Sequence, residues 1–92
     1  MKIMQLMPPL KVFLKKHRTI YTIRKYNMTC TEVDIDGLIC RRIPLGRILS
    51  KEALEPYVKE SGFETIDAWW TKIKEINPRI KEFWLYKVEI KE

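Results

Sequence analysis

The chain has 92 residues, 46% of them hydrophobic, and it carries a formal net charge of +6. This length predicts a single domain spanning residues 1–92, since chains divide into several cores only at roughly 250–300 residues, and the hydrophobic share argues against disorder. No segment approaches the ~18 apolar residues of a membrane span. Residues 1–9 are too short and interrupted for a secretory signal, so we expect a cytoplasmic protein without membrane contact.

The positive charge is concentrated at one end of the sequence. Residues 1–26 contain seven lysines and arginines and no acidic residue, whereas residues 27–92 contain eleven basic and twelve acidic residues. This asymmetry favours a polyanionic partner such as RNA, DNA or an anionic membrane surface. A basic surface that only keeps the protein in solution is the competing interpretation.

The first two segments differ in how clearly they predict structure. Residues 10–16 fit either a helical turn or the start of a strand, and the pattern leaves both open. Residues 19–26 are rich in β-branched and aromatic side chains, which predicts a strand. Alternation along this strand places Thr22 and Arg24 on the same face.

The clearest local signal is the hairpin around Asp36-Gly37. Asp-Gly between two strand-like runs predicts a two-residue type I′ turn, and the turn fixes the register. Glu32 then lies opposite Arg41, as a cross-strand ion pair. One face carries an apolar set expected in the core: Val33, Ile35, Leu38 and Cys40.

The cysteines and the single histidine predict neither a disulfide nor a metal site. Cys30 and Cys40 have opposite parity in the hairpin register, so Cys40 is interpreted as a small buried hydrophobe. Their spacing matches no zinc motif, and His17 alone leaves too few further ligands. We therefore expect no metal and no cofactor.

A short helix is expected after the hairpin. Ser50 stands at its N-cap, with Leu49 and Leu54 at the positions of a hydrophobic staple. Pro56 predicts a kink or a restart within it, because proline removes a backbone donor. Gly62 ends it as a left-handed cap residue.

A second helix and a closing strand follow. Thr65 caps the helix and Asn77-Pro78 stops it, and residues 83–90 alternate as a strand. Trp69 and Trp70 are adjacent, so one belongs in the core and the other is left to stack on a base or to cover a partner surface. The order of elements predicts an α+β domain whose antiparallel sheet can curl into a small barrel.

Three motifs in this order resemble the ASCH family, a branch of the PUA-like β-barrels. They are Arg18 to Arg24 (RTIYTIR), Ser61 to Trp69 (SGFETIDAW) and the closing strand from Trp84 to Ile90. The resemblance implies a small β-barrel of mostly antiparallel strands flanked by short helices, with a cleft near the Thr-x-Arg strand. It also implies RNA binding, which many members are inferred to perform.

Some small bacterial members hydrolyse an amide on N4-acetylcytidine, which makes a nucleoside amidohydrolase an alternative. The resemblance puts Thr22 at the family's threonine and offers Glu60 or Glu64 for its carboxylate. The family's lysine has no match, because the aligned position reads Arg18 or Thr19. Arginine stays protonated and cannot serve as a general base, so enzymatic activity is left open.

The expected RNA contacts centre on Thr22 and Arg24, which can hold a phosphate or a base edge. Further phosphate contacts are expected from Lys15, Lys16, Arg18, Arg42 and Arg47. The competing interpretations are an ion pair between Arg24 and a neighbouring strand, and a solvated loop at residues 15–18. A protein-interaction module that uses the Trp69–Trp70 helix is a third function, and the sequence does not indicate an oligomeric state.

Overall fold

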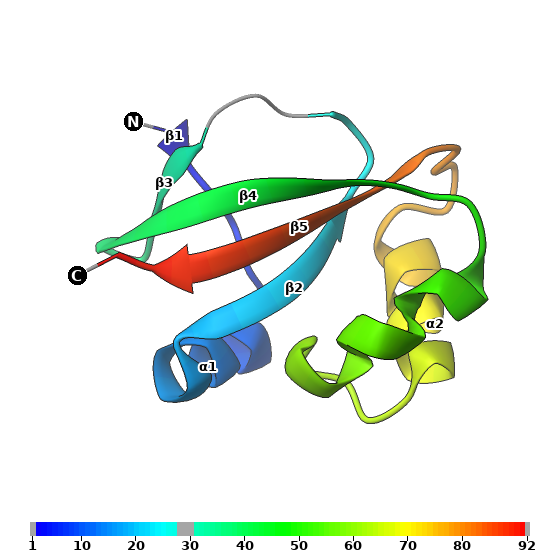
Figure 1. The fold of residues 1–92 in the computed structure, drawn as a ribbon, viewed down its shortest axis with the longest axis horizontal. Helices are drawn as coiled ribbons and strands as arrows, with labels where there is room; N and C mark the ends of the chain where they lie inside the picture. The colour runs from blue at the N-terminus through cyan, green and yellow to red at the C-terminus, as the bar shows by residue number, and fades with distance from the viewer. Residues whose placement is uncertain (1, 28–30, 92) are drawn as a thin grey trace.

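The computed structural model describes residues 2–27 and 31–91 (Figure 1). Its elements in chain order are β1 (Lys2–Ile3), α1 (Pro8–His17), β2 (Thr19–Arg24), β3 (Glu32–Ile35), β4 (Leu38–Ile48), the 3-10 helix η1 (Lys51–Glu60), α2 (Ile66–Ile76) and β5 (Phe83–Ile90). The α+β class is confirmed, and so are the strands that the sequence predicts around the hairpin and at the end of the chain.

The five strands form one open mixed sheet in the order β1-β3-β4-β5-β2. β1 pairs with β3 in parallel, and the other neighbours are antiparallel. The expected β-barrel is therefore wrong, because β1 and β2 form the two edges and the described strands do not close on each other. The reason is that other segments cover apolar surface on both faces, the second face over β2, β5 and the end of β4, so that closure is not needed to remove this surface from water.

The segment whose structure the sequence left open is helix α1. Pro8 and Pro9 occupy its first positions, where the missing N–H costs nothing and the fixed φ suits a helix. Arg18 ends the helix in the left-handed region, with φ 67°, and its N–H donates to Leu14 O. The chain turns there directly into β2, so that Leu14 packs in the same core as Ile20.

The β3–β4 hairpin has the predicted turn and register. Asp36 and Gly37 both have positive φ, 55° and 85°, as a type I′ turn requires. The charged contacts are shared differently from the prediction: Arg41 contacts Glu89 at 3.6 Å, and Glu32 accepts a hydrogen bond from Lys91. Cys40 is a free, buried thiol, whereas Cys30 lies outside the described residues, and with it the disulfide prediction.

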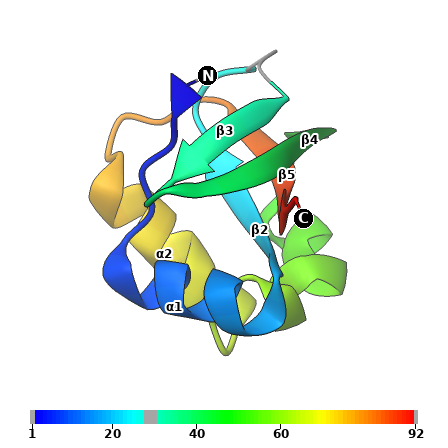
Figure 2. The same ribbon diagram turned by 90° about the vertical axis from the view of Figure 1, so that its left-hand side faces the viewer.

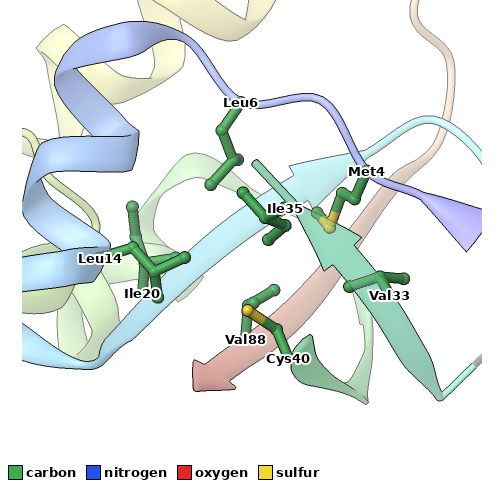
Figure 3. Packing of buried hydrophobic residues seen from close by; sticks show 8 residues of the cluster. All are labelled: Met4, Leu6, Leu14, Ile20, Val33, Ile35, Cys40 and Val88. Carbon is green, nitrogen blue, oxygen red and sulfur yellow. The ribbon is translucent and has the colours of Figure 1, made fainter. Parts of the chain in front are cut away.

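The sheet has a separate hydrophobic core on each face. One core joins the segment before α1 and α1 itself to β2–β5; Figure 3 shows its buried members: Met4, Leu6, Leu14, Ile20, Val33, Ile35, Cys40 and Val88. The second core joins η1 and α2 to the opposite face, around Leu54, Trp69, Ile73, Ile80 and Leu85. Figure 2 shows the helices gathered around edge strand β2, away from the β1–β3 edge.

The two helices of the second core begin differently. Ser50 precedes η1 without a side-chain cap hydrogen bond, and Leu49 is 83% exposed while Leu54 is buried. The hydrophobic staple is therefore wrong, because β4 leads into η1 with Leu49 turned toward solvent. Thr65 caps α2 as predicted, since its hydroxyl accepts from Ala68 N at 3.0 Å.

None of the helices in the described part of the chain is both long and apolar enough to cross a membrane.

Candidate functional site

A pocket of about 320 Å³ opens at the end of β2. Residues 5–10 form one wall, the last residues of β2 form the floor, and α2 forms the opposite wall. Its polar lining consists of Gln5, Thr22, Arg24, Lys72 and Asn77, and apolar side chains including Phe63 and Ile76 line the rest. The predicted pair Thr22 and Arg24 thus lies in one pocket.

Arg24 is held in this pocket without a carboxylate. Its Nη2 donates to the carbonyl oxygen of Gln5 at 2.7 Å, while its Nε is buried and has no acceptor. Burial of the side chain and, after it, the nearby Arg42 cation lower the pKa of the Arg24 guanidinium. The pocket lining contains no acidic residue, and among residues 2–27 and 31–91 Arg24 forms no ion pair with a neighbouring strand.

Arg42 lies beneath this region and not in an open cleft. Its side chain is buried, 4% exposed, and its guanidinium carbon lies 5.5 Å from the centre of the Tyr86 ring. The Tyr86 hydroxyl donates to the carbonyl oxygen of Tyr26 at 3.0 Å. Arg42 therefore adds positive potential behind Arg24, and Tyr86 fixes the chain where it leaves β2.

Lys72 is the second cation of the pocket, and the sequence analysis missed it. Its Nζ contacts Glu75 at 3.1 Å on the surface of α2, and Glu75 does not line the pocket. Lys72 stands among Trp69, Ile73 and Ile76 at the spacing of a single helix face. A lysine on an otherwise apolar helix face was the signal available in the sequence.

The remaining predicted RNA contacts lie elsewhere. Lys15 contacts Asp36 at 3.3 Å, Lys16 is exposed on α1, and Arg18 lines a separate hollow beside Arg41 and Lys91. Arg18 precedes the start of β2, and the strand from Thr19 to Arg24 is ~16 Å long at the usual rise of ~3.3 Å per residue. The structure thus does not bring residues 15–18 and Arg24 into one cleft.

Arg47, the last of the predicted contacts, lies near the far end of β4. Its guanidinium contacts Glu82 at 3.9 Å, and it does not line the pocket.

The residues proposed for catalysis are not assembled. Thr22 is buried in the pocket, whereas Glu60 and Glu64 are exposed and do not line it. The lining therefore offers Thr22 no carboxylate or imidazole to act as a general base. Within the residues that the structure describes, no group of three or more His, Cys, Asp or Glu gathers.

The structure of α2 shows which of its two adjacent tryptophans lies in the core. Trp69 is buried in the second core, 2% exposed, and its ring is stacked with Phe63. Trp70 is partly buried and stacks on Phe83, with 4.5 Å between ring centres. The second tryptophan therefore has an aromatic partner within the chain.

Comparison with family models, with curated protein sequences and with solved structures finds no match for this chain.

Proposed function

We propose that this protein binds single-stranded RNA and that the pocket at Thr22 and Arg24 receives one unstacked nucleotide. In this arrangement Arg24 and Lys72 bind a phosphate, and the base lies against the apolar lining that includes Phe63. The half-buried guanidinium of Arg24, whose buried Nε has no acceptor and whose pocket has no carboxylate, carries the proposal.

A half-buried cation without a counter-charge is costly, because the buried part of the group loses its hydration. One hydrogen bond to a backbone carbonyl replaces only part of that hydration, and Nε is left without an acceptor. A phosphate oxygen in the pocket supplies both the missing acceptor and the missing negative charge. Arginine suits this role, because its planar donors match phosphate geometry.

The shape and polarity of the pocket fit a nucleotide. About 320 Å³ lies at the lower end of the range for small-molecule sites, which are mostly apolar with a few placed polar groups. The Thr22 hydroxyl and the Asn77 amide can donate and accept, as base edges and a ribose hydroxyl require. The net charge of +6 adds long-range attraction for a polyanion. We also propose that the protein acts in the cytoplasm, the location expected from the sequence.

The test is a fluorescence anisotropy titration of a labelled RNA of about ten nucleotides at ~50 and ~200 mM salt. The wild type is expected to lose affinity steeply with salt, and Arg24→Gln to weaken binding by ~10-fold or more. Arg41→Gln is the matched control, since it removes the same charge from the other end of the sheet. Equal binding by wild type and Arg24→Gln, or no binding at tens of micromolar protein, contradicts the proposal.

A DNA oligonucleotide of the same sequence forms the second arm. Contacts to the ribose 2′-hydroxyl make RNA the tighter ligand. Equal affinity for both would keep the pocket as a nucleotide site and remove the preference for RNA.

A further inference from the structure

A second hollow, of about 610 Å³, adjoins the pocket. It lies between the residues that follow β2 and the connection from α2 to β5. Ile76 and Asn77 line both cavities. The two cavities therefore meet at Ile76 and Asn77. Arg24 lines the first cavity, and the next residue, Lys25, lines the second.

The second hollow is lined by cations that the protein does not neutralise. Among residues 2–27 and 31–91, Lys25, Arg79 and Lys81 form no ion pair. Glu82 is the one acidic residue in the lining. Its carboxylate contacts Arg47 at 3.9 Å and accepts from Trp84 Nε1 at 3.2 Å, so its charge is already engaged.

An exposed aromatic ring stands at the same hollow. Tyr26 is 61% exposed, and Lys25 Nζ lies 5.2 Å from the centre of its ring. The hydrogen bond from Tyr86 to Tyr26 O, 3.0 Å long, fixes the backbone there. An exposed aromatic ring on an anchored backbone, beside cations that have no carboxylate partner, is the arrangement that binds a stacked base and its phosphate in single-stranded nucleic acid.

We propose that the two cavities form one continuous track and that the second hollow binds the next nucleotide of the same RNA strand. Its base stacks on Tyr26, and Arg79 and Lys81 contact the phosphates that flank it. This inference rests on the proposed function, because it assigns the first nucleotide to the Arg24 pocket. The minimal ligand is then an unpaired stretch of two or more nucleotides.

A length series tests the track. Affinities are measured for adenosine monophosphate, a dinucleotide and a trinucleotide by isothermal titration calorimetry on the full chain. The trinucleotide is expected to bind at least ~10-fold more tightly than the monophosphate, given the usual gain per stacked base. Tyr26→Ala is expected to remove most of this gain and to leave monophosphate affinity within ~2-fold.

A second variant, Arg79→Gln/Lys81→Gln, tests the phosphate contacts on exposed residues whose replacement leaves the core intact. It is expected to lower trinucleotide affinity. The slope of the logarithm of the binding constant against the logarithm of the salt concentration is expected to become shallower by ~0.7 for each lost phosphate contact. Lys15→Gln/Lys91→Gln is the control, with the same change in net charge at the other end of the sheet.

The outcomes separate the two proposals. Binding of the monophosphate with no gain for longer RNA, or a full gain retained by both Tyr26→Ala and Arg79→Gln/Lys81→Gln, overturns the track and leaves the nucleotide pocket standing. No binding of any of the three ligands overturns both. Circular dichroism melts of each variant establish that a loss of affinity is not a loss of folding.

Discussion

The two ends of the sheet contain similar numbers of basic side chains but treat them differently. Where β2 begins, lysines and arginines contact carboxylates: Lys15 with Asp36, Arg41 with Glu89, and Lys91 with Glu32. Where β2 ends, Arg24, Lys25, Arg79 and Lys81 form no ion pair within the described residues. Three cations at the first end thus have carboxylate partners, although Lys16 there is exposed and forms no described ion pair. The four cations at the second end have none among the described residues.

A charge excess in one part of the sequence therefore does not locate a charge excess on the surface. Residues 1–26 contain no acidic residue, yet in the fold Lys15 contacts the carboxylate of Asp36 in the hairpin turn. The candidate site gains Lys72, Arg79 and Lys81 from a part of the chain whose total charge is nearly balanced. Proximity in the fold decides which charges meet, because fields at the surface are screened beyond ~8–10 Å at ordinary salt.

The largest expected effect comes from reversing charge at one end or the other. Lys25→Glu/Lys81→Glu and Lys15→Glu/Lys91→Glu alter the net charge equally. The first pair is expected to weaken RNA binding by ~100-fold, and the second by less than ~5-fold, because only the first places carboxylates in the track. Anisotropy titrations of both variants check this. Equal losses would show that total charge alone governs binding.

The next effect concerns stability. Arg24→Met is expected to raise the free energy of unfolding by about 1 kcal/mol, because it removes a half-buried cation that has no carboxylate in its pocket. That corresponds to a rise in melting temperature of roughly 4–8 °C for a domain of this size. Lys91→Met, at the end where β2 begins, is expected to give no rise. Thermal melts followed by circular dichroism measure both, and a destabilised Arg24→Met would show that the guanidinium supports the fold.

A smaller effect distinguishes two glutamates. Glu82→Gln removes the one acidic group in the lining of the second hollow and is expected to raise RNA affinity by ~2-fold. Glu89→Gln makes the same charge change beside Arg41, away from the track, and is expected to leave affinity unchanged. Titrations under identical salt compare them. A similar rise in both variants would argue against a local site.

The smallest effect is a titration at the end of the sheet where β2 begins. The hydrogen bond from Lys91, and then its charge, lower the pKa of the Glu32 carboxyl. A lowered pKa in the folded state stabilises the fold above the ordinary glutamate pKa of ~4.3, and this contribution is lost as the pH falls through the lower value. Lys91→Met should raise the Glu32 pKa and reduce this pH dependence, which carboxyl NMR titration measures. An unchanged pKa would show that Lys91 does not hold the carboxylate in solution.

Local chemistry made much of the fold predictable. Asp36-Gly37 determined both the turn and the hairpin register, and Thr65 determined the start of α2, because each acts on residues two or three positions away. The open sheet was not predictable in this way, since it depends on which segments cover each face. Strand β2 held a hint, because Ile20 and Ile23 lie on opposite faces and both are apolar.

The candidate site divides similarly. Parity along one strand placed Thr22 and Arg24 together, and both line the pocket. Contacts between distant segments give Lys15 a carboxylate partner and place Arg24 in a pocket without one. No local sequence pattern encodes such contacts. Lys72 lay within reach of sequence reasoning, as a lysine on the apolar face of α2.

The position of β5 has a consequence for how the protein folds. β5 lies between β4 and β2 in the sheet, although Thr22 and its partner Tyr86 are far apart in sequence. Among the described strands β2 has no neighbour besides β5, so both its pairing and the Tyr86 bond to Tyr26 require that residues 83–90 have been made. Such distant pairing slows folding, since the entropy of closing a long loop is lost before the strand contacts contribute any stabilising free energy. During synthesis the residues of β2 are therefore made well before their partner strand, and a fragment that ends before residue 83 lacks the strand that joins β2 to β4.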